Sequence, residues 1–173
     1  NLHYLDWGGV GPALIFLPGW GCNAYIFTHF APRFSDRFRV LALTRRGHGD
    51  SDHPENGYDL DSLTEYIRQF MDELGIERAV LAGHSLAGVE LSHMAVKYPQ
   101  RIDKLVYLDS AFEYGRQDFK DLMAKNPARG FDQPDVANEY DTAEEYEAAI
   151  LRAFPSLAAI WGPVMRENFL HEI

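Results

Sequence analysis

The central stretch of this chain is Ala79-Val80-Leu81-Ala82-Gly83-His84-Ser85-Leu86-Ala87-Gly88. An apolar run comes first, and small residues then surround Ser85. A serine raised on a tight turn between a strand and a helix has strained backbone angles and allows only small residues two positions away on either side. Gly83 and Ala87 occupy those positions. We therefore predict a nucleophile elbow at Ser85, and the alternative is that Ser85 is only the N-cap of a helix.

The first 110 residues alternate between apolar runs and segments with helical spacing. The pattern predicts strands over residues 2–7, 13–17, 38–43, 79–82 and 105–108, and helices over 23–34, 60–74 and 86–98. Continuous apolar runs are typical of strands buried on both faces. The alternation predicts an α/β fold, a mostly parallel sheet with helices on both faces, in which ligands bind at the carboxyl ends of the strands.

The character of the chain changes after Ala111. No further strand-like run appears, and acidic residues, alanine and scattered aromatics dominate as far as Ile173. Thr142-Ala143-Glu144-Glu145 fits a capping box that opens a helix toward Arg152. We predict two parts, a sheet-containing core over 1–110 and a helical cap over 111–173. Aromatic residues of the cap are expected either to wall an apolar pocket or to form the core of the cap: Phe112, Tyr114, Phe119, Phe131, Phe154 and Trp161.

Charge and composition exclude several classes of partner. The 173 residues carry a formal charge of −10, which repels nucleic acid and anionic membrane surfaces. No uncharged apolar run approaches the roughly 18 residues that a membrane span requires, so we expect no membrane insertion. The expected location is cytoplasmic, and secretion through a signal peptide ahead of Asn1 is the alternative. The single cysteine, Cys22, excludes an internal disulfide and is read as a small hydrophobe. Nothing in the sequence indicates an oligomeric state.

A second glycine-bearing loop, Pro18-Gly19-Trp20-Gly21, follows the predicted strand over 13–17. In a parallel sheet this loop lies near the turn at Ser85. Acyl transfer needs amide donors aimed at the developing oxyanion. We predict that the backbone amides of Trp20 and Leu86 form this oxyanion hole. The alternative is an ordinary turn between a strand and a helix.

These motifs resemble the α/β-hydrolase fold superfamily, specifically capped serine hydrolases of the esterase type. The resemblance covers residues 2 to about 112. It rests on Leu17-Pro18-Gly19-Trp20, Arg46-Gly47-His48-Gly49-Asp50-Ser51, the Gly83–Gly88 turn and Val106-Tyr107-Leu108-Asp109. Pro18 replaces a usual histidine, Thr44 a frequent aspartate and Ala87 the commoner glycine. The resemblance also implies that His84 is a packing residue.

The resemblance implies a triad of serine, acid and histidine in that order along the chain, with the histidine after the last strand. None of the seven histidines matches this base. Asp109 is the candidate acid, with Glu113 as a weaker rival. Most proteins of this type carry the acid one strand later, and an aspartate at this point is also a common turn former. The chain begins at Asn1 and shows no capping signal near Ile173. We therefore expect a fragment that lacks its base and has little or no activity.

A metal site is a poor alternative. His48, Asp50, Asp52 and His53 crowd one loop, but they lack an established ligand spacing. We predict no metal and no cofactor.

The predicted function is hydrolysis of carboxylic esters or related acyl compounds, with a small acyl molecule as substrate. A serine at this position argues against haloalkane dehalogenase and epoxide hydrolase chemistry, which on this fold uses aspartate. Other reactions of the fold stay open: those of lactonases, aminopeptidases, acyltransferases, cofactor-free haloperoxidases and carbon–carbon hydrolases. A catalytically silent small-molecule binder is the alternative outside enzymes.

Overall fold

The structure is a computed structural model that describes residues 1–110, 141–153, 162, 166–168 and 171. The predicted boundary of a cap at residue 111 lies at the edge of this described part. Among the described residues no helix is long and apolar enough to span a membrane.

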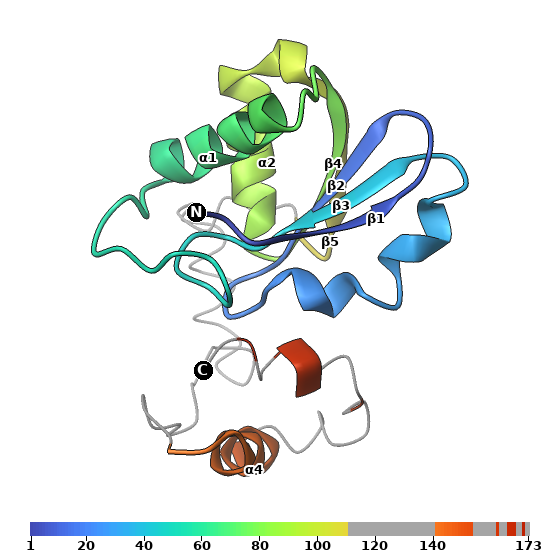
Figure 1. Cartoon of the computed structure of the whole chain (residues 1–173). Helices are drawn as coiled ribbons and strands as arrows, with labels where there is room; N and C mark the ends of the chain where they lie inside the picture. Colours follow the sequence, from blue (N-terminus) through green and yellow to red (C-terminus); the bar gives the residue numbers. More distant parts are fainter. Residues whose placement is uncertain (111–140, 154–161, 163–165, 169–170, 172–173) are drawn as a thin grey trace, which may run out of the picture.

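A five-stranded sheet forms the centre of the fold (Figure 1). Its strands are β1 (Tyr4–Gly8), β2 (Ala13–Leu17), β3 (Arg39–Leu43), β4 (Ala79–His84) and β5 (Ile102–Leu108). They lie in the order β1-β3-β2-β4-β5, with β1 antiparallel to β3 and the other pairs parallel. Every residue of β2 is buried, as expected for a continuous apolar run at the centre of a parallel sheet. The predicted fold class is confirmed.

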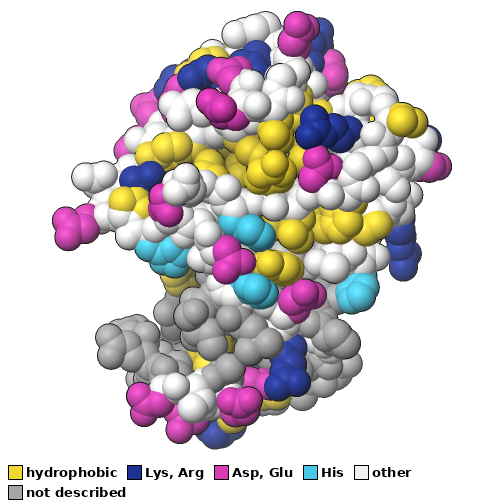
Figure 2. All heavy atoms as spheres, viewed as in Figure 1, with side chains coloured by type: hydrophobic (Ala, Val, Ile, Leu, Met, Phe, Trp, Pro, Cys, Tyr) yellow, Lys and Arg dark blue, Asp and Glu magenta, His cyan; other side chains and the backbone are white. Residues whose placement is uncertain are grey.

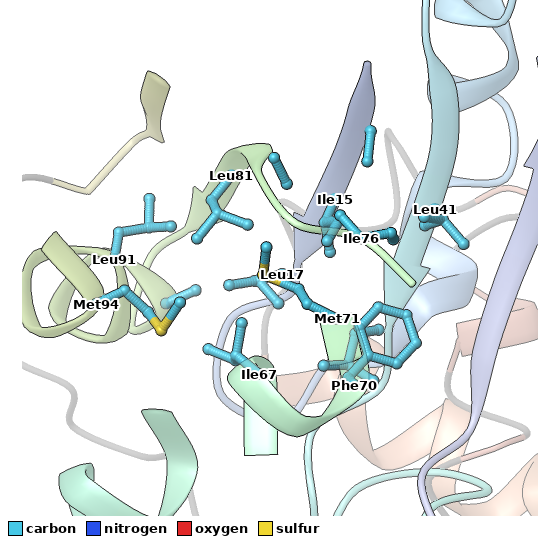
Figure 3. Packing of buried hydrophobic residues seen from close by; sticks show 14 residues of the cluster. Ile15, Leu17, Leu41, Ile67, Phe70, Met71, Ile76, Leu81, Leu91 and Met94 are labelled. Atoms are coloured by element: carbon cyan, nitrogen blue, oxygen red, sulfur yellow. The ribbon is translucent and has the colours of Figure 1, made fainter. Parts of the chain in front are cut away.

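Two α-helices cover one face of the sheet, α1 (Leu60–Glu73) and α2 (Ala87–Lys97). Asp59 caps α1 by accepting a hydrogen bond from the Ser62 amide at 2.9 Å. Side chains of both helices and of alternate strand residues pack into one apolar cluster (Figure 3). Its labelled members are Ile15, Leu17, Leu41, Ile67, Phe70, Met71, Ile76, Leu81, Leu91 and Met94. Because strand side chains alternate between faces, Leu14 and Phe16 of β2 point to the opposite cluster.

The predicted helix over 23–34 is wrong in its form. Two short 3₁₀ helices stand there, η1 (Ala24–Phe27) and η2 (Ala31–Phe34), and they cover the second face of the sheet. Pro32 has no amide hydrogen and cannot donate to a carbonyl one turn earlier, so a continuous α-helix cannot run through it. Phe27 packs against Phe16 with ring centroids 4.9 Å apart, so the segment still buries its apolar side chains.

Strand β5 differs from the fully buried strand that the sequence predicts. It is longer, and Val106 and Tyr107 are 40% and 39% exposed. Within the described residues β5 has a neighbour, β4, on one side only. An apolar run therefore indicates a strand, but its burial depends on where the strand lies in the sheet.

Beyond the core, the structure describes the helix α4 (Ala143–Ala153) and a short helical segment over 166–168. The Thr142 hydroxyl accepts a hydrogen bond from the Glu145 amide at 3.2 Å. This is the N-terminal half of the predicted capping box, so the start of this helix is confirmed. The predicted pocket aromatics of the cap lie outside the described residues.

Candidate active site

Ser85 occupies the turn between β4 and α2, with a φ of 50°. This left-handed conformation is uncommon for a residue with a side chain and costs free energy that the surrounding structure must supply. Two backbone hydrogen bonds hold the turn: the Ser85 amide donates to the Leu108 carbonyl at 3.1 Å, and the Gly88 amide donates to the Ser85 carbonyl at 3.0 Å. Neither uses the amide of Leu86. Ser85 itself is partly exposed.

Close packing explains the small residues around this turn. A Cβ on Gly83 would lie 2.8 Å from Cδ1 of Leu91, and one on Gly88 would lie 2.1 Å from Oγ of Ser110. The methyl group of Ala87, in contrast, is fully buried in the core. The turn therefore accommodates alanine at position 87, whereas a side chain at position 83 or 88 would force neighbouring atoms to shift.

The loop after β2 approaches Ser85 closely. Strands β2 and β4 are neighbours, with Leu17 paired to Gly83, so the two turns that follow lie at the same edge. A Cβ on Gly19 would be 3.1 Å from Cβ of Ser85 and 3.0 Å from Nδ1 of His84. The structure therefore brings the predicted oxyanion loop against Ser85. Trp20, the residue after Gly19, is 64% exposed.

His84 lies beside Gly19, and its Nδ1 atom is buried without a hydrogen-bond partner among the described residues. The packing role of His84 stays a prediction.

Asp109 follows β5 directly and has a φ of 51°. The carbonyl of the preceding residue, Leu108, accepts the hydrogen bond of the Ser85 amide. The following residue, Ser110, is buried next to Gly88. Asp109 is exposed. Because His84 pairs with Leu108, Asp109 follows its strand at the same end of the sheet as Ser85. Its weaker rival, Glu113, lies outside the described residues.

Most histidines in the described structure are engaged away from Ser85. His3 pairs with Thr44, His48 with the Arg46 carbonyl, His53 with the Gly49 carbonyl, His93 with Asp61 and His171 with Asp50. Figure 2 shows histidine side chains next to acidic ones in the middle of one face. Among the described residues no histidine hydrogen-bonds to the Ser85 hydroxyl.

The residues weighed as metal ligands do not converge. In the described part of the chain no group of three or more histidine, cysteine or acidic side chains is arranged to hold a metal ion. Burial and the positive charge of Arg45 lower the pKa of His48 below its usual value. Thr44, which replaces a frequent aspartate, is buried. Its hydroxyl accepts a hydrogen bond from the Ala24 amide and forms another with Nδ1 of His3. Cys22 is partly exposed.

Sequence reasoning missed a buried ion pair next to this site. Arg45 follows β3 and Glu90 lies on α2, and their charged groups meet at 2.5 Å. The only sequence signal is a glutamate between Val89 and Leu91, on an otherwise apolar stretch of helix.

Comparison with known proteins gives the family. The family model of the alpha/beta hydrolase fold matches residues 12–154, most of the chain. This chain belongs to the α/β-hydrolase fold family. The resemblance inferred from the motifs is confirmed, and the order of strands and helices described above is the family's architecture.

This α/β-hydrolase chain covers only part of the length of each relative that it matches. 2-(Acetamidomethylene)succinate hydrolase of Mesorhizobium japonicum is 37% identical over 101 residues, 58% of this chain and 36% of that protein. Bifunctional epoxide hydrolase 2 of Mus musculus is 35% identical over 115 residues, 65% of this chain and 21% of that protein. The crystal structure of E-2-(acetamidomethylene)succinate hydrolase matches with a TM-score of 0.76 and 27% identity, covering 98% of this chain and 59% of that one.

Proposed function

We propose that the complete protein is a serine hydrolase of carboxylic esters or related acyl compounds that works through an acyl-enzyme on Ser85. One observation carries the proposal: Ser85 is held at φ 50° at the carboxyl end of β4, and Gly19 lies so close that a Cβ there would be 3.1 Å from Cβ of Ser85. A strained, partly exposed serine beside a glycine loop is the arrangement that acyl transfer requires.

In this mechanism Oγ of Ser85 attacks the acyl carbon and gives its proton to a histidine that lies outside the residues of this chain. The carbonyl oxygen becomes an oxyanion and accepts hydrogen bonds from the amides of Leu86 and Trp20. The alcohol leaves with the proton from the histidine, and water then attacks the acyl-enzyme to release the acid. Asp109 is the proposed acid that orients the histidine. No cofactor takes part.

The relatives support hydrolysis as the reaction class. One is named as a hydrolase of an acetamido compound and another as an epoxide hydrolase, and the chain covers only a minor part of each. A serine favours the first kind of chemistry, because it forms an acyl-enzyme, over the second, for which the fold uses an aspartate. The substrate class proposed here therefore stays at esters and related acyl compounds.

Labelling with a fluorophosphonate tests the proposal. The reagent forms a stable adduct with an activated serine, so we expect one adduct per full-length molecule, located on Ser85 by peptide mass. Ser85→Ala should remove both the adduct and the hydrolysis of p-nitrophenyl esters. Ser92→Ala is the matched control, because Ser92 lies on α2 and is exposed. Labelling should persist in that variant.

The alternative is a catalytically silent small-molecule binder on the same fold. In that case the folded full-length protein would not react with the fluorophosphonate at Ser85, and Ser85→Ala would leave ligand binding intact. This result would replace the hydrolase proposal.

A further inference from the structure

The Arg45–Glu90 ion pair lies between the end of β3 and helix α2. Nε of Arg45 donates to Oε1 of Glu90 at 2.5 Å, and Nη2 donates to Oε2 at 3.0 Å, so both carboxylate oxygens are bound. The two side chains are only 7% and 5% exposed. Removing two charges from water is costly, and a well-packed apolar pair is often as stable. A contribution to stability alone therefore does not explain why two charged residues are buried here.

The remaining donors of Arg45 bind the loop after β2. Nη2 donates to the Pro18 carbonyl at 2.8 Å, and Nη1 donates to the Gly19 carbonyl at 3.1 Å. The planar guanidinium has five N–H donors in a fixed fork, so it can bind both carboxylate oxygens and two backbone carbonyls at the same time. Arg45 is thus bound to the loop on one side and, through Glu90, to α2 on the other.

The contact with the Gly19 carbonyl has a consequence for the amide of Trp20. Both groups belong to the same peptide unit, and the structure contains no cis peptide bonds among its described residues. In a planar trans peptide the C=O and N–H bonds point in opposite directions. With the Gly19 carbonyl directed at Arg45, the Trp20 N–H must point away from Arg45. The same holds for the Pro18 carbonyl and the Gly19 N–H.

Glu90 connects this loop to the second amide of the site. It lies four residues after Leu86, one helical turn further along the segment that starts at the Ser85 turn. The ion pair therefore joins the peptide that presents the Trp20 N–H to the helix whose start presents the Leu86 N–H.

We propose that Arg45 and Glu90 are positioning residues that set the direction and spacing of the two oxyanion-binding amides. Arg45 orients the Gly19–Trp20 peptide, and Glu90 holds the guanidinium and ties it to α2. This inference rests on the proposed function, since it assigns a role within the same site.

Steady-state kinetics of the full-length protein on a p-nitrophenyl ester test the inference. Arg45→Lys keeps the positive charge, but its three donors on one nitrogen cannot make the four hydrogen bonds that Arg45 donates. Because an oxyanion exists only in the transition state, kcat should fall by about tenfold or more while KM changes by less than about twofold. Glu90→Gln, which keeps the shape and loses the charge, should give the same split with a smaller loss.

A phenylboronic acid adds a readout that a purely structural role would not change. It forms a tetrahedral anion on the serine, so its affinity should fall in Arg45→Lys by about the same factor as kcat. Arg39→Lys is the control. Arg39 begins β3, the strand that Arg45 follows, and it pairs with Asp6 at 2.9 Å. This substitution should leave both kcat and the boronate affinity unchanged. Thermal unfolding of each variant shows whether it is folded at the assay temperature.

The outcomes separate the two proposals. If Ser85→Ala abolishes turnover but folded Arg45→Lys and Glu90→Gln keep the wild-type kcat and boronate affinity, the positioning role is wrong and the hydrolase proposal stands. A rise in KM with unchanged kcat would also overturn the positioning role. If the wild type shows no turnover that depends on Ser85, both proposals fall together.

Discussion

Asn23 and Asn168 are 145 residues apart in the chain, and each is fully buried against the other. The Asn23 amide donates to Oδ1 of Asn168 at 2.9 Å, and Nδ2 of Asn23 donates to the Asn168 carbonyl at 2.8 Å. Oδ1 of Asn23 also accepts from the Tyr25 amide at 3.0 Å, which starts η1. One asparagine side chain therefore organises the start of a core helix and holds a residue from the far end of the chain.

Asn168→Ala should lower the free energy of unfolding by about 1–3 kcal/mol, because it leaves the buried amide of Asn23 without an acceptor. Urea denaturation followed by tryptophan fluorescence measures the change. The control is Asn56→Ala, at an exposed position, which should change stability by less than about 0.5 kcal/mol. Equal effects of the two substitutions would show that the Asn23–Asn168 contact adds no stability.

The strained backbone of Ser85 predicts a reversal of the usual ranking of glycine and alanine. At φ 50° alanine retains the strain and glycine removes it, so Ser85→Gly should be more stable than Ser85→Ala by about 1 kcal/mol. At Ser92, inside α2, the order should be opposite by about the same amount. Thermal melts of the four variants provide the comparison, and a glycine variant at position 85 that is less stable than the alanine variant contradicts the strain argument.

Gly88 and Ser110 should be energetically coupled. Gly88→Ala places a methyl group 2.1 Å from Oγ and 2.9 Å from Cβ of Ser110, an overlap that should cost about 1–3 kcal/mol of stability. In a Ser110→Gly background both clashing atoms are gone, so the same substitution should cost at least about 1 kcal/mol less. A double-mutant cycle by urea denaturation measures this difference, and additive effects would mean that the clash is relieved elsewhere.

His48 should make the protein less stable as the pH falls. Burial, followed by the charge of Arg45, lowers its pKa in the folded protein, whereas in the unfolded chain the pKa is near 6.5. Between the two values the unfolded chain binds more protons, so the free energy of unfolding decreases as the pH drops below about 6.5 and levels off below the folded pKa. Above about pH 7.5 the effect vanishes.

His48→Gln removes this titration and keeps a polar side chain. The difference in stability between pH 7.5 and pH 5.5, measured by urea denaturation, should be smaller in the variant than in the wild type. His29→Gln is the control at an exposed position. An unchanged pH dependence in His48→Gln would assign the titration to other groups, of which His3, whose pKa burial also lowers, is the first to test.

Several elements were predictable because their signals are local. The apolar run over 13–17 marks β2, and Asp59, Gly75 and the helical spacing between them mark α1. The positions of Ser85 between a strand and a helix, and of Gly19 after the neighbouring strand, follow from the same alternation. The segment over 23–34 was mispredicted because apolar spacing alone does not distinguish an α-helix from two 3₁₀ turns around Pro32.

The amino-acid sequence by itself determined the family, the strand and helix segments of the core and the serine on which the proposed chemistry depends, because each is recorded in neighbouring residues through periodicity and backbone preference. Only the tertiary structure decided that Arg45 meets Glu90 and the loop at Gly19, that β5 is exposed on one side, and that Asn23 holds Asn168. These contacts join residues far apart in the chain, and their energies arise from burial and geometry that exist once the sheet has assembled.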